Sequence, residues 1–265
     1  LENNVSKKEE CLDFFQNSKP QTKTKEKKMT KYNFQKASQA ISKAPIKVMI
    51  YGDSGVGKTT LAVTSPKPLV LLTEKNGVPS IHASNPNACI IYCSSIQDVR
   101  NVVSGIMNGD KELAQFETLV IDSLTETQRM IQDDVLKKAR RDSMQLQDYG
   151  KLADATRGLI RVLRDLPINV VSTALNDVDS EEATGTRHHQ PIFIGKKTGK
   201  EIAQWFTCIG YMYRRDIKEG DDKVAQRNIM FDGASSVLCK TAPNLEGVIK
   251  NPNLTEIFNQ IQKTK

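Results

Sequence analysis

The 265-residue sequence has no apolar run that approaches the roughly 20 residues needed to cross a membrane. Its first residues are polar and rich in lysine, which excludes the apolar segment of a secretory signal. These absences predict a cytoplasmic protein that has no membrane partner.

Cysteine and histidine are scarce, with five and three residues respectively. The odd number of scattered cysteines favours free thiols in a reducing compartment over a disulfide framework. Cys89 and Cys93 are close in sequence, but no second pair completes a zinc site, so buried thiols are the favoured interpretation over a metal site.

Acidic residues are fewer than basic ones, 31 against 38, which gives a net charge of +7. Such an excess favours a polyanionic partner and makes nucleic acid plausible, although part of the charge lies in the tails.

The length suits a single α/β domain of about 220 residues with a tail. Residues 1–30 are polar and lack periodic apolar positions, so we expect a disordered basic leader there and a folded domain over 31–265. One hypothesis is that Met29 is the natural start; the alternative is a basic arm that contacts nucleic acid.

A glycine-rich loop follows the apolar run at 46–51 and precedes a helix-prone segment. Its sequence GDSGVGKTT matches the phosphate-binding pattern G-x-x-x-x-G-K-[ST] in the strand, loop and helix context that the pattern requires. The glycines let backbone N–H groups surround an anion, the lysine reaches the β and γ phosphates, and the first threonine binds Mg²⁺. The predicted ATP site comprises Gly52, Asp53, Ser54, Gly55, Val56, Gly57, Lys58, Thr59 and Thr60. The alternative is a merely glycine-rich surface turn.

Two carboxylates follow later apolar runs. Asp122 ends the strand LVID and suits a Walker B residue that supports Mg²⁺ through water. Glu74 follows the run PLVLLT and is our candidate for the base that activates the attacking water, with a solvated loop glutamate as the alternative.

The remaining pattern alternates apolar strands with amphipathic helices, which predicts a mainly parallel sheet flanked by helices. We expect a turn at 147–150 before a helix that ends near 166, and a loop over 176–199. Short strands at 208–213, 227–231 and 237–240 read as antiparallel additions to the sheet edge, and a helix closes the chain at 254–261.

The loop over 176–199 lies where a ligand crevice opens in such folds, and it could bind a phosphate backbone. Its histidines, His188 and His189, lack a third ligand at metal spacing, so a solvated loop is favoured over a metal site. The basic helix end at 137–141 is interpreted as a capped terminus, with DNA contact as the alternative.

The order of these motifs resembles the RecA-type ATPase core, and residues 29–265 resemble phage-encoded RecA-like nucleotide-binding proteins of single-strand annealing and recombination. The likeness rests on YGDSGVGKTTLA, TLVIDSLTE, QDYGKL and the P-x-x-x-G-K segment at 191–196. It implies a RecA-like P-loop NTPase domain over 31–265 that binds ATP and Mg²⁺, with Lys58 and Glu74 catalytic and Asp122 supporting the metal.

The resemblance also implies single-stranded DNA contact by the 177–200 segment, with Arg187, Lys196, Lys197 and Lys200 as candidates. The sequence departs from the family at the γ-phosphate sensor, where only Thr173 or Asn176 is present. It departs again near the last strand, which leaves Lys240, Arg214 and Arg215 as candidates to reach a neighbouring subunit's nucleotide.

These observations predict an ATP-dependent single-stranded DNA binding protein that acts in annealing or recombination, with slow, DNA-stimulated ATPase activity, assembled as a ring or filament. The alternatives are a P-loop motor or remodelling factor and a nucleotide-gated interaction protein.

Overall fold

The structure is a computed structural model that describes residues 36–37, 40, 44–180, 185–195, 198–219, 222–233, 235–245 and 247–263. Residues 37–265 form one compact unit. The predicted leader at 1–30 lies outside the described residues.

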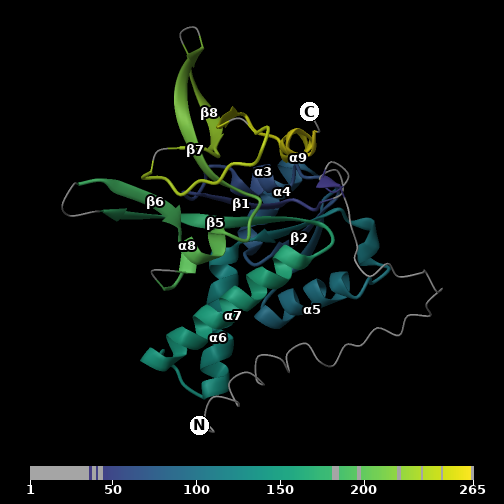
Figure 1. The fold of residues 1–265 in the computed structure, drawn as a ribbon, viewed down its shortest axis with the longest axis vertical. Coiled ribbons are helices and arrows are strands. Elements are labelled where there is room, and N and C mark those ends of the chain that lie inside the picture. The colour runs from purple at the N-terminus through teal and green to yellow at the C-terminus, as the bar shows by residue number, and fades with distance from the viewer. Residues whose placement is uncertain are drawn as a thin grey trace. The chain divides into compact units, whose positions relative to one another are not determined.

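Among the described residues, nine strands make one sheet with the order β3-β2-β4-β5-β1-β7-β8-β9, and β6 pairs with β5 (Figure 1). The strands are β1 (Lys47–Gly52), β2 (Pro68–Leu72), β3 (Cys89–Tyr92), β4 (Thr118–Asp122), β5 (Asn169–Ser180), β6 (Arg187–Pro191), β7 (Cys208–Glu219), β8 (Asp222–Met230) and β9 (Val248–Lys250). The strands from β3 to β7 along this order pair in parallel, whereas β8 and β9 are added in antiparallel fashion. The predicted α/β class with a mainly parallel sheet and antiparallel strands at one edge is confirmed.

Helices cover both faces of the sheet. Successive side chains of a strand point to opposite faces, and the central strands carry apolar side chains on both. In β1, Met49 and Tyr51 pack with α5 to α8, while Val48 and Ile50 pack with α3, α4 and α9. The helices are α3 (Lys58–Ala62), α4 (Val78–Ser84), α5 (Ile96–Met107), α6 (Leu124–Ala139), α7 (Leu146–Asp165), α8 (Thr198–Ala203) and α9 (Leu254–Gln262), with short 3₁₀ turns η2 (Lys75–Gly77) and η3 (Leu113–Gln115). None of the helices in the described part of the chain is long and apolar enough to span a membrane.

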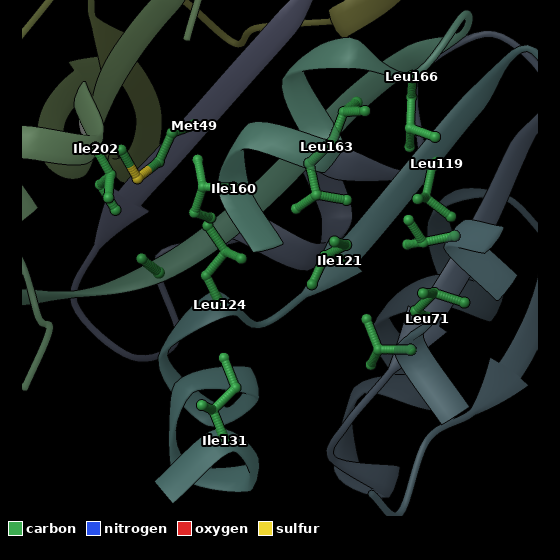
Figure 2. Close-up of a cluster of buried hydrophobic side chains, with 14 of the residues drawn as sticks. Met49, Leu71, Leu119, Ile121, Leu124, Ile131, Ile160, Leu163, Leu166 and Ile202 are labelled. Atoms are coloured by element: carbon green, nitrogen blue, oxygen red, sulfur yellow. The ribbon is translucent and has the colours of Figure 1, made fainter. Parts of the chain in front are cut away.

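The larger core lies between the sheet and helices α5, α6 and α7 (Figure 2). Leu119 and Ile121 of β4 meet Leu163 of α7 and Leu124 of α6 there, and all four are at most 2% exposed. This packing holds β4 in the middle of the sheet, so the residue at its carboxyl end has a fixed position.

The prediction of a loop over 176–199 is wrong for residues 176–180 and 187–191, which form strands, and for residues 198–199, which begin α8. Strand β5 continues to Ser180 and pairs in antiparallel register with β6, from Asn176 opposite Pro191 to Ser180 opposite Arg187. The sequence here is polar and has no apolar alternation, because this two-stranded ribbon extends beyond the helices that cover the sheet (Figure 1).

Strand β7 also differs from the expectation of an antiparallel addition. It runs parallel to β1, with Met49 opposite Ile209, and only then pairs with β8 in a long antiparallel hairpin. Residues 237–240 contribute isolated bridges to His189 and Ile209 instead of a strand. β7 therefore belongs to the parallel core and covers the edge of β1.

The turn expected at 147–150 is instead the first part of α7. The carboxylate of Asp148 is fully buried, accepts a hydrogen bond from the Gln145 backbone N–H at 3.1 Å, and pairs with Arg141 at 2.7 Å. Asp148 thereby caps the helix and anchors the segment between α6 and α7.

Replacing Asp148 with alanine removes both interactions, so Asp148→Ala should lower the free energy of unfolding by about 2 kcal/mol. Urea denaturation followed by circular dichroism measures the change. Asp154→Ala is a matched control on the same helix, since Asp154 is 72% exposed and its pair with Arg157 should contribute little. Equal effects of the two substitutions would contradict the anchoring role.

Candidate functional site

The loop between β1 and α3 takes a conformation that its glycines permit. Gly55 and Gly57 have φ of 79° and 105°, in the left-handed region where a side chain is strained. A Cβ on Gly52 would lie 2.2 Å from the Met212 carbonyl oxygen, so the close approach of β1 and β7 also requires glycine there. The loop curls its backbone above the sheet, and α3 begins directly at Lys58.

The ammonium of Lys58 lies over this loop. Its Nζ donates to the carbonyls of Gly52 at 2.8 Å and Asp53 at 2.7 Å. Burial lowers the pKa of Lys58, while the nearby carboxylates of Asp122, Asp53 and Glu74 oppose that shift. The lysine therefore brings a positive charge to the concave side of the loop.

The carboxylate of Asp122 is held by threonines from two other elements. Thr59 of α3 donates to Oδ2 at 2.8 Å, and Thr173 of β5 donates to Oδ1 at 2.5 Å. Next to it, the Thr73 hydroxyl donates to the Asp122 carbonyl at 2.9 Å and accepts from the Ser123 N–H at 3.0 Å. Both oxygens of the carboxylate are thus oriented by residues of the neighbouring strands and helix.

Glu74 lies where β2 gives way to the turn η2, and it lines one cavity with Lys58, Thr59 and Asp122. The cavity has a volume of about 350 Å³ and also contains Thr173 and residues of the glycine-rich loop. Gly77 packs closely against β2, since a Cβ there would lie 2.9 Å from Leu72 Cδ1. The structure therefore gathers the predicted phosphate loop and both predicted carboxylates around one space.

The oxygen atoms at this point fit a magnesium ion. A threonine hydroxyl and one carboxylate, 2.8 Å apart, are hard ligands of the kind that Mg²⁺ uses together with phosphate oxygens and water. Thr59 and Asp122 would hold the ion beside Lys58.

A hydrogen-bonded chain leads from the loop to the β5–β6 ribbon. The amide nitrogen of Asn176 donates to Asp53 Oδ1 at 2.9 Å and lies 3.2 Å from His189 Nδ1. Tyr51 of β1 adds a further link, since its hydroxyl donates to the His189 carbonyl at 3.1 Å.

The other sensor candidate, Thr173, is engaged with Asp122, as described above. Of the candidates for a neighbouring nucleotide, Arg214 and Arg215 are exposed on β7, whereas the Lys240 ammonium donates to the Phe206 carbonyl at 2.5 Å. The two arginines are therefore better placed than Lys240 to contact the nucleotide of a neighbouring subunit.

The predicted DNA-contacting residues are only partly described. Arg187 on β6 and Lys200 on α8 are exposed, and Lys196 and Lys197 lie outside the described residues. Within the part of the chain that the structure describes, no group of three or more His, Cys, Asp or Glu is placed to hold a metal ion.

Sequence reasoning missed Arg227, which extends from β8 to the glycine-rich loop and lines the cavity there. It also lines a second cavity of about 490 Å³. The other residues that line this cavity are Thr60 and, from α4, Pro79, Ser80, Ala83 and Ser84. No local motif marks this arginine, because it is brought to the site only by the pairing of β8 with β7.

This combination of a glycine-rich loop, a lysine, a threonine and a strand-ending aspartate at one edge of a parallel sheet defines a P-loop ATPase domain. The chain belongs to the AAA domain family, since the model of that family matches residues 44–242. Among solved structures, it is similar to an ATPase from the type III secretion system of pathogenic bacteria, at 16% identity and a TM-score of 0.44. That similarity covers 66% of this chain, and the chain spans 54% of that protein's length. No match was found among curated proteins.

The position of Glu74 gives a first prediction for the site. Glu74→Gln keeps the shape but removes the basic carboxylate, so the rate of ATP hydrolysis should fall about 100-fold or more while ATP affinity changes little. Steady-state phosphate release and titration with a fluorescent ATP analogue measure the two quantities. Asn76→Ala, at the same cavity but without a carboxylate, is the control. An unchanged rate of hydrolysis in Glu74→Gln would contradict the role of Glu74 as the catalytic base.

Proposed function

We propose that this chain binds single-stranded DNA in an ATP-dependent manner and acts in strand annealing or recombination in the cytoplasm. The observation that carries this proposal is the hydrogen-bonded chain from Asp53 through Asn176 to His189. It connects the nucleotide loop to a polar two-stranded ribbon, in which β6 carries Arg187, His188 and His189 and β5 carries Asp177 and Asp179.

Aromatic rings near the base of the ribbon support contact with unpaired bases. His189 of β6 lies 5.0 Å from the Tyr211 ring, and Tyr211 stacks with Tyr213 at 5.8 Å, measured between ring centroids. These three side chains are half-buried, so each is partly accessible. Single-stranded nucleic acid is recognised by such stacking surfaces combined with basic residues, which here are Arg187 and Lys200.

The chemistry at the P-loop is hydrolysis of the β,γ-phosphoanhydride bond of ATP. The loop amides and Lys58 bind the phosphates, and Glu74 orients the attacking water and takes its proton. Magnesium, when bound, neutralises charge on the β and γ oxygens. Thr59 and Thr173 keep the Asp122 carboxylate turned towards that position through the two hydrogen bonds already described.

Self-association into a ring or filament is part of the proposal. Arg214 and Arg215 are exposed cations on the β7–β8 hairpin and suit contact with a nucleotide in the next subunit of a head-to-tail assembly. ATP would then stabilise the assembly by lying between subunits.

DNA binding by the purified protein tests the function directly. Fluorescence anisotropy of a labelled single-stranded oligonucleotide should show tighter binding with ATP or a non-hydrolysable analogue than without nucleotide. Because Lys and Arg displace counterions from phosphates, the affinity should fall steeply between about 50 and 200 mM salt. Binding that is absent, or that does not respond to salt, would overturn the proposal.

A charge-removing variant locates the contact. The double substitution Arg187→Ala with Lys200→Ala should weaken DNA binding and reduce the salt slope by about two. Lys111→Ala, which removes an exposed charge after α5, is the control and should change the slope little. If the protein unwinds duplex DNA and does not pair complementary strands, the alternative of a P-loop motor is favoured instead.

The bond between Asn176 and Asp53 predicts how ATP and DNA influence each other. Asn176→Ala should retain binding of each ligand alone but reduce the factor by which ATP increases DNA affinity. That factor measures the coupling free energy between the two sites, and the substitution removes the hydrogen bond that links them. Gln190→Ala, which alters a neighbouring contact between β5 and β6, is the control. An unchanged factor in Asn176→Ala would show that the coupling takes another route.

A further inference from the structure

Arg227 lies against Gly57 of the phosphate loop. A Cβ added to Gly57 would be 2.8 Å from Arg227 Nε and 3.0 Å from its Cδ. The guanidinium and its stem therefore occupy the space that a side chain at Gly57 would fill. Residues 57 and 227 are brought together because β8 pairs with β7, which in turn lies next to β1.

The structure records no carboxylate partner for Arg227 in the part of the chain that it describes. Arg141, Arg157 and several other arginines, by contrast, have carboxylate partners. Its side chain is exposed to the cavity, and a guanidinium at a phosphate loop increases the attraction for an anion.

The location along the loop indicates which part of a nucleotide it meets. Lys58, Thr59 and Asp122 mark the β and γ phosphates and the metal. Arg227 instead stands where the two cavities meet, since both are lined by Thr60, Ser80 and Arg227. The amides of a phosphate loop bind the α and β phosphates, and Gly57 belongs to that part of the loop.

We propose that Arg227 is a nucleotide-binding residue that contacts the α and β phosphates of the nucleotide held by its own subunit. A guanidinium can donate two parallel hydrogen bonds to phosphate oxygens, which an ammonium cannot do. This inference rests on nucleotide binding by the P-loop and is independent of DNA binding. It gives the β7–β8 hairpin a role within its own subunit, in addition to any contact that it makes with another.

Nucleotide titrations of the full chain test the proposal. Arg227→Ala should raise the Kd of fluorescent ATP and ADP analogues by similar factors of about 10 to 100, the loss expected for a charge-assisted hydrogen bond. Arg227→Lys should recover part of the affinity because it keeps the charge without the planar fork. An effect below about threefold, or a loss confined to ATP, overturns the assignment to the α and β phosphates.

Controls separate this residue from the site as a whole. Lys223→Ala removes an exposed positive charge from the same strand and should leave both Kd values unchanged. Lys58→Ala should abolish binding; if the unmodified protein binds no nucleotide, both the site and Arg227 are refuted. If nucleotide binding depends on Lys58 but not on Arg227, the proposed role of Arg227 is refuted and the P-loop site stands. The unfolding temperature without nucleotide should be the same for the Arg227 variants and the original protein.

Mixing variants distinguishes action within a subunit from action between subunits. A mixture of Arg227→Ala and Lys58→Ala chains should show no more ATP hydrolysis than the two samples measured separately. In such a mixture, an arginine acting on a neighbour would meet an intact P-loop and restore activity. Recovery of hydrolysis would therefore overturn the assignment to the same subunit.

Discussion

The carboxylate of Asp122 is the point on which the arrangement of the site depends. It ends a strand whose side chains are buried on both faces, and its two oxygens accept hydrogen bonds from α3 and from β5. The parallel register places the ends of β1, β4 and β5 side by side, so the loop after β1 opens directly above the aspartate. Three segments far apart in the sequence are therefore fixed relative to one another by one ionisable group and two hydroxyls.

Much of this centre could be predicted because its signals are local. Gly55 and Gly57 are required by their own backbone conformations, and Asp122 follows an apolar run that is long enough for a strand. The β5–β6 ribbon could not be predicted in the same way, since its residues are polar on both faces and its strands are defined only by pairing with each other. Arg227 was missed for a related reason, because strand pairing alone brings it to the loop.

Charged residues were harder to interpret, since a sequence does not reveal which charges the fold itself uses. Lys240 was a candidate to reach another subunit, yet its ammonium donates to the Phe206 carbonyl beside β7. Asp148 was assigned to a turn and Arg141 to a capped helix end, but the two form an ion pair in which the Asp148 carboxylate is fully buried. In each case a partner distant in space, and not the local pattern, determines what the charge does.

The position of β7 has a consequence for shortened forms of the chain. β1 is an interior strand only because β7 covers one of its edges, with Val48 opposite Cys208. A chain that stopped before residue 208 would retain the whole glycine-rich motif and Asp122, yet its central strand would expose unpaired N–H and C=O groups along that side. Such a fragment would match the motif and still tend to associate through its open edge.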